Sequence, residues 1–142
     1  MAILAITPYL LVYGKGEAAI ALYQRALGAE LEMLQRFGEV DDNCPEAMRD
    51  RVMHAELSVG GGRLMLSDGV GDDADAGGTP TVAVAVGLDE PDSMRKAFRV
   101  LAERGTVQQE IIEASFGYFG SLIDEFGVNW MFQCPADGEG GQ

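Results

Sequence analysis

One short stretch of the chain combines an alternating pattern with side chains that can do acid–base chemistry. His54, Glu56 and Ser58 are polar, and Ala55 and Leu57 between them are apolar. Successive side chains of a β-strand point to opposite faces of the sheet, so the pattern predicts a strand with all three polar groups on one face. A histidine beside a carboxylate suits a general base with its orienting partner, or a pair that hydrogen-bonds a ligand. Two side chains that merely satisfy each other on a half-exposed strand fit the pattern equally well.

The elements expected around this strand begin with a strand over residues 3–13, in which Ile6, Leu10 and Val12 face one way. Glycines turn the chain at 14–16, and a helix over 17–27 follows, ended by Gly28. Its apolar positions have the i, i+3, i+4, i+7 spacing of a buried stripe: Ala19, Leu22, Tyr23 and Ala26. The first half is completed by a weaker strand at 30–37, a loop at 38–50, the strand of His54, a glycine hairpin turn at 60–62 and a strand at 63–67.

The same order of elements then returns after residues 68–80, which are rich in glycine and aspartate and are a linker by composition. The second half is expected to contain a helix that starts at Pro91 and is capped by Gly105, and strands at 81–86, 106–110, 119–123 and 128–133. We therefore predict an α+β fold of two tandem βαβββ modules, whose curled mixed sheets surround a cavity. Module one covers about 1–68 and module two about 80–136 of a single domain, with a linker at 69–79 and a flexible tail at 137–142.

Composition narrows the classes of function. The 142 residues include 23 acidic and 10 basic side chains, a net charge of −13, which argues against nucleic-acid or anionic-membrane partners. Cys44 and Cys134 are far apart and form no disulfide framework, so we expect a reducing cytoplasm. The sequence shows no signal peptide and no apolar run long enough to span a membrane.

Six blocks of sequence point to a known family: 7–10 (TPYL), 19–23 (AIALY), 27–30 (LGAE), 53–57 (MHAEL), 64–68 (LMLSD) and 119–131 (FGSLIDEFGVNWM). Together they resemble the PhnB-like branch of the vicinal oxygen chelate superfamily, also called glyoxalase/bleomycin resistance/dioxygenase. Members of this branch are often labelled after a demethylubiquinone methyltransferase. The resemblance covers nearly the whole chain and implies a homodimer.

The resemblance also implies where a metal would be held. The four ligand positions of the metal-dependent members fall on Thr7, Glu56, Thr81 and Met131, of which only Glu56 suits a hard or borderline cation. We therefore expect no metal and no cofactor, with a divalent ion conceivable only through Glu56. A methyltransferase of the common type needs a doubly wound sheet and a longer glycine-rich turn than residues 14–16, so methyl transfer is not expected.

From these features we expect a binder of a small, partly apolar molecule, in which His54 and Glu56 are the candidate catalytic pair. The other residues expected to line the site are Thr7, Tyr9, Ser58, Thr81, Phe119, Asn129, Met131 and Gln133. Tyr9, Phe119, Phe116 and Tyr118 suit an apolar pocket or the core, and Trp130 and Phe132 are expected in the core. Two alternatives remain: a metal-dependent lyase, isomerase or ring-opening dioxygenase, and a dimeric scaffold.

Overall fold

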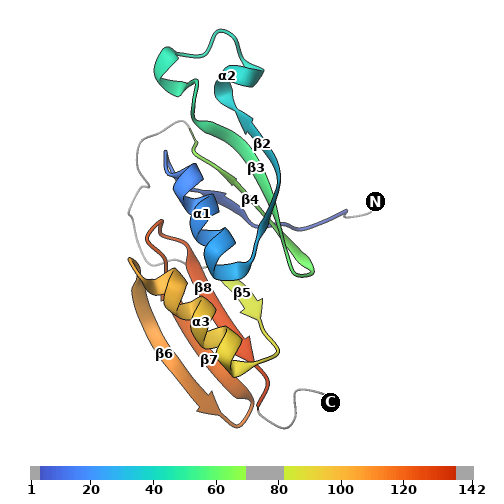
Figure 1. Cartoon of the computed structure of the whole chain (residues 1–142), viewed down its shortest axis with the longest axis vertical. Helices are drawn as coiled ribbons and strands as arrows, with labels where there is room; N and C mark the ends of the chain where they lie inside the picture. Colours follow the sequence, from blue (N-terminus) through green and yellow to red (C-terminus); the bar gives the residue numbers. More distant parts are fainter. Residues whose placement is uncertain (1–3, 70–81, 137–142) are drawn as a thin grey trace. The chain divides into compact units, whose positions relative to one another are not determined.

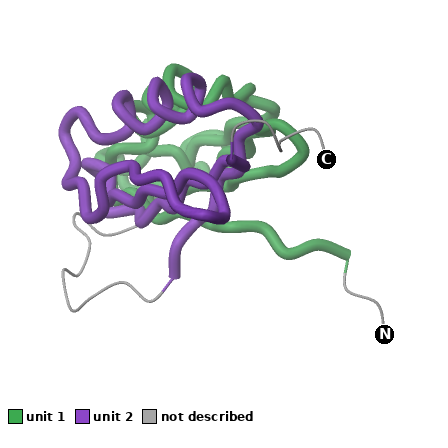
Figure 2. The backbone as a smooth tube through the Cα atoms, turned by 90° about the horizontal axis from the view of Figure 1, so that it is seen from below, with its two compact units in different colours: residues 1–76 green, residues 77–142 purple. Residues whose placement is uncertain are grey.

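The computed structural model describes residues 4–69 and 82–136. The chain forms two compact units, residues 1–76 (unit 1) and 77–142 (unit 2), which are coloured separately in Figure 2. Each unit contains a four-stranded mixed sheet with a helix of three turns across one face (Figure 1). The predicted α+β fold of two βαβββ modules is confirmed. Within residues 4–69 and 82–136, no helix is both long and apolar enough to cross a membrane.

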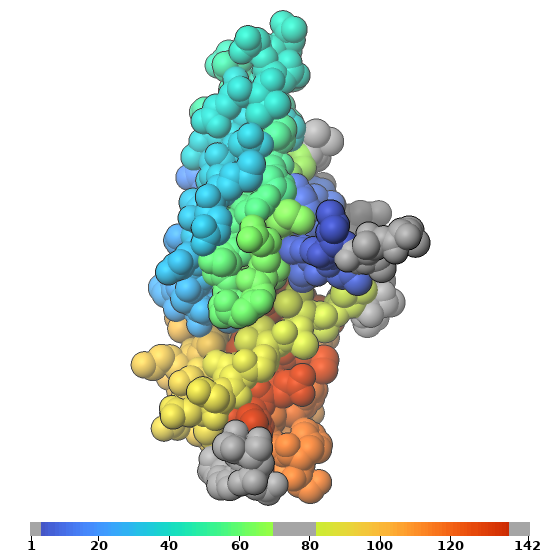
Figure 3. Space-filling model, turned by 90° about the vertical axis from the view of Figure 1, so that its right-hand side faces the viewer, coloured from blue at the N-terminus to red at the C-terminus, as the bar shows by residue number. Residues whose placement is uncertain are grey.

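Unit 1 has the strand order β1-β4-β3-β2, with β1 parallel to β4 and the other neighbours antiparallel. Its elements are β1 (Tyr9–Leu11), α1 (Gly16–Leu27), β2 (Glu30–Arg36), α2 (Phe37–Val40), the 3-10 helix η1 (Glu46–Met48), β3 (Val52–Val59) and β4 (Gly62–Ser67). The first strand is much shorter than predicted, because residues 4–8 form no strand. These residues are mostly exposed, and the space-filling view shows the start of the described chain at the surface in dark blue (Figure 3). Ile6, expected to face inward, is 90% exposed.

The buried stripe of α1 forms as predicted, except that Ala26 is only half-buried. Ala19, Leu22 and Tyr23 are buried and face the sheet side that carries Ala55 and Leu57, both fully buried. Each large apolar side chain buried in this way stabilises the fold by about 1.5–3 kcal/mol. The helix ends at Gly28, whose left-handed backbone (φ 67°) lets its N–H donate to the Gln24 carbonyl at 3.1 Å.

The loop predicted over 38–50 is partly regular, because α2 and η1 lie within it. The α2 turn is capped by Glu39, whose Oε1 accepts a hydrogen bond from the Arg36 N–H at 3.1 Å. The Arg36 guanidinium also pairs with Glu17 of α1 at 2.5 Å and donates to the Asp50 carbonyl at 2.7 Å. These contacts are between polar groups and leave no apolar periodicity in the sequence, so the sequence pattern did not indicate these two helical turns.

Asp68, assigned to the linker from composition, is instead a buried structural residue. It is only 4% exposed and accepts hydrogen bonds from the backbone N–H groups of Gly16 at 2.5 Å and Val52 at 2.7 Å. A Cβ on Gly16 would lie 2.6 Å from the Asp68 carboxylate, so a glycine is required at that point. Asp68 thereby joins the start of α1 to the start of β3, the strand that carries His54 and Glu56. Beyond Gly69 the predicted linker lies outside the described residues, as does the predicted tail.

Unit 2 repeats the order with β5-β8-β7-β6, and β5 is parallel to β8. Its elements are β5 (Val84–Gly87), α3 (Pro91–Ala102), β6 (Thr106–Ala114), β7 (Gly117–Ile123) and β8 (Asn129–Cys134). Pro91 occupies the first turn of α3, as predicted, and the stripe from Met94 to Leu101 is buried. Trp130 and Phe132 are also buried, so their predicted place in the core is confirmed.

Gly105 is not the residue that caps α3 directly, contrary to the prediction, because Glu103 follows the helix in a right-handed conformation. The Gly105 N–H still donates to the carbonyl of Ala102, the last helical residue, at 3.0 Å, and Gly105 comes close to the end of β7. A Cβ on Gly105 would lie 2.2 Å from the Ile123 carbonyl oxygen, so the position has no room for a side chain. Next to it, buried Asp124 accepts hydrogen bonds from the Trp130 indole at 2.9 Å and from two backbone N–H groups, which fixes the turn into β8.

Candidate functional site

The face of the unit 1 sheet away from α1 carries a continuous row of side chains across all four strands. In register, Tyr9 of β1 lies opposite Met65 of β4, Met65 opposite Glu56 of β3, and Glu56 opposite Met33 of β2. Side chains directly opposite one another have Cβ atoms about 4.5–5.5 Å apart, close enough to interact. The alternation predicted for β3 is confirmed, since Ala55 and Leu57 are fully buried while His54, Glu56 and Ser58 are half-buried.

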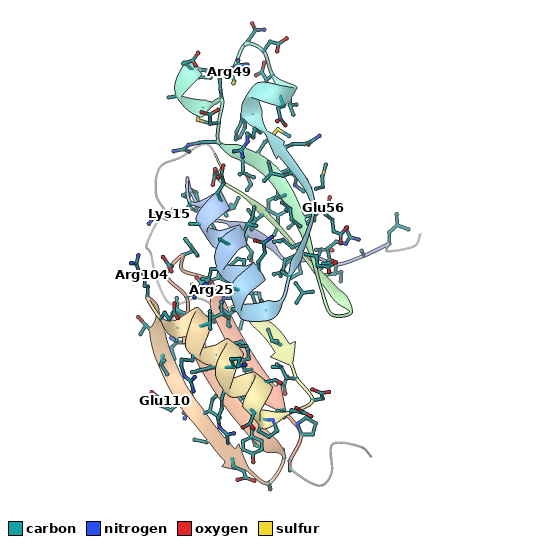
Figure 4. All side chains as sticks on the ribbon, in the orientation of Figure 1. Lys15, Arg25, Arg49, Glu56, Arg104 and Glu110 are labelled. Atoms are coloured by element: carbon teal, nitrogen blue, oxygen red, sulfur yellow. The ribbon has the colours of Figure 1, made fainter. Side chains whose placement is uncertain are left out.

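Four of these side chains form one hydrogen-bonded chain. The Tyr9 hydroxyl lies 2.9 Å from His54 Nδ1, His54 Nε2 lies 2.9 Å from Glu56 Oε2, and Arg63 Nη1 donates to Glu56 Oε1 at 2.7 Å. The Tyr9 and His54 rings also stack, with centroids 5.5 Å apart. Three strands therefore contribute to the network, and Figure 4 labels Glu56 at its centre on β3. We call Tyr9, His54, Glu56 and Arg63 the polar network.

Electrostatics determine the proton positions in the polar network. The hydrogen bond from His54 lowers the pKa of Glu56 most; desolvation opposes this effect, and the hydrogen bond from Arg63 adds a smaller lowering. An ionised Glu56 can only accept, so His54 Nε2 must carry the hydrogen in that pair. In the neutral ring Nδ1 is then an acceptor, and the Tyr9 hydroxyl donates to it. The carboxylate thus fixes which imidazole nitrogen faces the tyrosine.

Ser58 and Thr7 are placed differently from the histidine pair. Ser58 Oγ donates to Glu32 Oε2 of β2 at 2.7 Å, so its hydroxyl pairs with the sheet edge. Thr7 is half-buried and precedes β1. Arg63 was not predicted from the sequence. The Gly60–Gly62 turn could have indicated it, because the hairpin register that the turn sets places Arg63 opposite Ser58. Met33 and Met65 were missed because neither strand was expected to contribute to the site.

On the corresponding face of the unit 2 sheet, the residues paired with Met131 and Phe119 are uncharged. Met131 of β8 lies between Ala85 and Ser121 in register, and Phe119 lies between Ile112 and Gln133. Asn129 shares this face, where its side-chain amide donates to the Val82 carbonyl at 3.2 Å. Thr81 lies outside the described residues. The prediction that the faces of the two sheets enclose one cavity stays a prediction.

Two further aromatic residues lie away from this face. Phe116 is 68% exposed in the turn before β7. Tyr118 is buried on the helix side, where the Arg95 guanidinium lies 5.5 Å from its ring centroid. Tyr118 forms one end of an open groove of about 570 Å³ between α3 and β6, with Phe98, Val107 and Ile111 among its apolar lining residues. The sequence did not predict this groove, because it depends on how α3 packs against β6.

The described residues do not fit the four-ligand metal centre that the resemblance implies. Within residues 4–69 and 82–136, no three His, Cys, Asp or Glu side chains cluster in a way that could hold an ion. Both carboxylate oxygens of Glu56 already accept hydrogen bonds, and one of the donors is a guanidinium at 2.7 Å that would repel a cation. Met131 offers a soft thioether, which suits neither Mg²⁺ nor Mn²⁺.

Comparisons with known proteins agree with this architecture. The family model described as "Glyoxalase/Bleomycin resistance protein/Dioxygenase superfamily" matches residues 5–132. Protein YjdN of Escherichia coli (strain K12) is 32% identical over 139 residues, covering 89% of this chain and 92% of that protein. Among solved structures, protein PA1353 from Pseudomonas aeruginosa has a TM-score of 0.80 at 34% identity, over 95% of this chain and all of that one. A PhnB protein from Bacillus cereus, titled a putative 3-demethylubiquinone-9 3-methyltransferase, has a TM-score of 0.74 at 25% identity, over 91% and 98% of the two chains.

Proposed function

This chain belongs to the glyoxalase/bleomycin resistance protein/dioxygenase superfamily, and from this premise we propose that it binds a small, partly apolar molecule without a resident metal ion. The observation that carries the proposal is the unit 1 face, where the polar network is flanked by methionines in register on both sides of Glu56. Binding sites of this kind combine apolar walls with a few convergent polar groups that fix the orientation of the ligand.

The apolar part of the proposed site is accessible in unit 1. Tyr9 is 45% exposed, Leu11 48% and Met33 37%, all on the face that carries the polar network. Methionine side chains are flexible and polarisable, so they adapt to an irregular ligand surface. The polar network then supplies hydrogen-bond partners at one end of the ligand. This combination favours a molecule with an apolar body and one polar group.

Two other activities receive less support from the same residues. A metal-dependent lyase, isomerase or dioxygenase needs ligands that the described residues do not bring together, and Arg63 opposes a cation beside Glu56. Methyl transfer of the common type needs a doubly wound parallel sheet, whereas each described sheet has a single parallel pair of strands. The methyltransferase title of the Bacillus cereus protein therefore does not carry over to our proposal.

The proposal is tested by a metal assay together with a ligand screen. Protein purified without chelator is analysed for zinc, iron, nickel and manganese, and then screened by thermal denaturation against small aromatic alcohols, ketones and acids, with 2-naphthol as a fluorescent reporter. A saturable ligand present at 100 times its Kd should stabilise the protein by about 2.7 kcal/mol. A stoichiometric metal ion would support the enzyme alternative instead.

Matched variants locate the binding. Met33→Asp places a charge on the proposed apolar wall and should weaken binding of 2-naphthol at least about tenfold, because a buried unpaired charge is costly. Glu110→Gln alters an exposed residue of β6 in unit 2 (labelled in Figure 4) and should leave the affinity unchanged. Equal affinities in Met33→Asp and in the wild type would contradict the proposed site.

Assembly and location are further proposals. Leu4 is 97% exposed and Ile6 90%, an apolar surface that supports the homodimer expected from the family. Sedimentation at micromolar concentration should show a dimer, and a monomer would contradict this. Neither Cys44 nor Cys134 forms a disulfide, and on this basis we propose a reducing compartment such as the cytoplasm.

A further inference from the structure

The polar network has the arrangement of a nucleophile, its base and the group that orients the base. We propose that Tyr9, His54 and Glu56 form a relay that makes the Tyr9 oxygen a nucleophile and general base toward the bound molecule. The fitting ligand is then a partly apolar molecule with an electrophilic centre or an acidic proton. This inference rests on the proposed function, because an activated phenol acts only on a molecule that reaches this face.

The geometry meets the requirements of such a relay. The nucleophile and base are within hydrogen-bond reach, at 2.9 Å between the Tyr9 hydroxyl and His54 Nδ1. The base is oriented in turn by a third group, at 2.9 Å between His54 Nε2 and Glu56 Oε2. Ring stacking at 5.5 Å holds the tyrosine and histidine planes together. No other tyrosine can have this partner, since His54 is the only histidine in the chain.

Accessibility distinguishes Tyr9 from a structural tyrosine. Tyr9 is 45% exposed, whereas Tyr23 is fully buried and Tyr118 is 7% exposed. His54 and Glu56 are less accessible, with 20% and 25% of their side chains exposed. The reactive oxygen therefore lies at the outer end of the relay, and the groups that support it lie behind it on β3.

The step balances without an external reagent. As the Tyr9 oxygen bonds to the electrophilic centre, the bond from that centre to its leaving group breaks and the leaving group keeps the electron pair. The phenolic proton passes to His54 Nδ1, and the imidazolium that forms is stabilised by the carboxylate of Glu56 until it gives its proton to the leaving group or to water. If the ligand offers a proton instead, the Tyr9 oxygen accepts it while its own proton passes to Nδ1, and the reverse transfers restore the relay. The hydrogen bonds from His54 and Arg63 both lower the pKa of Glu56, which favours an ionised carboxylate that accepts from both groups.

The relay can be tested with phenylmethanesulfonyl fluoride, a small and partly apolar electrophile. Attack by Tyr9 forms an O–S bond and breaks the S–F bond; fluoride leaves, and the phenolic proton goes to His54. Mass spectrometry of digested protein gives the labelling rates of Tyr9 and Tyr13. Tyr13, half-buried and two residues beyond β1, is the internal reference. Because general base catalysis contributes about 10²–10⁴-fold, Tyr9 should react at least about 100-fold faster than Tyr13.

Variants separate a chemical role of His54 from a structural one. His54→Ala should reduce the labelling of Tyr9 by about 100-fold and leave that of Tyr13 unchanged, and added imidazole should restore part of the lost rate. Circular dichroism and His54→Gln, which keeps a hydrogen-bonding side chain but not a base, guard against misfolding. Equal labelling of Tyr9 and Tyr13 in the wild type, or an unchanged Tyr9 rate in both His54 variants, would overturn the relay.

The same assay distinguishes failure of the relay from failure of the binding proposal. If 2-naphthol or another ligand from the screen protects Tyr9 but the labelling rate does not depend on His54, the binding proposal stands and the relay is wrong. If the rate depends on His54 but no ligand in the screen protects Tyr9, the relay stands and the binding proposal fails.

Discussion

The strand that carries the candidate site is held by a buried carboxylate that can be tested directly. Asp68 accepts from Gly16 N–H at 2.5 Å and from Val52 N–H at 2.7 Å, one bond to each of its oxygens. In Asp68→Asn, the amide oxygen can keep one of the two hydrogen bonds. The amide NH₂ group then faces the other backbone N–H, and because both groups are donors, the second hydrogen bond is lost. Hydrogen bonds to a charged group contribute about 1.5–3 kcal/mol each, so unit 1 should lose about that amount. Asp68→Ala loses both bonds and should cost about 3–5 kcal/mol.

Amide hydrogen exchange followed by NMR measures this loss where it occurs. Because 1.4 kcal/mol corresponds to a factor of ten, the β3 amides of Asp68→Asn should exchange about 10- to 100-fold faster than those of the wild type. Trp130 lies in unit 2 and is the only tryptophan, so its fluorescence reports on the other unit as an internal control.

A matched substitution sets the baseline. Asp41 is exposed and accepts from one backbone N–H, that of Asn43 at 3.0 Å. Asp41→Asn should change stability by less than about 0.5 kcal/mol, as is usual for surface sites. If Asp68→Asn accelerates β3 exchange no more than Asp41→Asn does, the buried carboxylate does not anchor this strand and the reasoning is refuted.

Three further outcomes are expected. The lowered pKa of Glu56 should appear in a carboxyl ¹³C NMR titration, and Arg63→Gln should raise this folded-state pKa. The ionised Glu56 stabilises the folded protein above its unfolded-state pKa of about 4.3, and this stabilisation is lost as the pH falls through the folded-state pKa. Gly117→Ala should prevent stable folding of unit 2, because the new Cβ would lie 2.2 Å from the Cys134 carbonyl oxygen. Gly28→Ala has open space around its Cβ and should lower the free energy of unfolding by only about 1–2 kcal/mol, from strain in the left-handed backbone. Similar urea midpoints for the two variants would contradict this. Zn²⁺ should raise the melting temperature of Arg63→Ala more than that of the wild type, and equal shifts would show that the guanidinium does not keep cations from Glu56.

Periodicity predicted the elements well where burial determines them. The stripes of α1 and α3 and the alternation of β3 follow from which faces must leave water, and all three form as expected. The failures concern polar residues whose partners are distant in sequence. Composition alone placed Asp68 in a linker, although its two backbone donors lie 52 and 16 residues away. Gly105 was assigned to a helix cap because a cap is the common local reason for a glycine there, whereas a close approach to β7 requires it.

The candidate site shows the same division between local pattern and tertiary register. The pairing of His54 with Glu56 could be inferred from alternation within one strand. The second hydrogen-bond partner of His54, and that of Glu56, could not be inferred in this way. Tyr9 reaches His54 only because β1 pairs with β4 in parallel, and Arg63 reaches Glu56 only through the hairpin register. These two partners change the chemistry of the pair: Arg63 opposes a cation and keeps the carboxylate ionised, and Tyr9 gives the histidine a proton donor at the accessible end. A duplicated fold therefore has an ionisable network on one sheet, while the matching face of the other sheet offers amide, thioether and aromatic groups. The side chains that we propose to determine reactivity are concentrated in unit 1, and substitutions there should alter chemistry before they alter the fold.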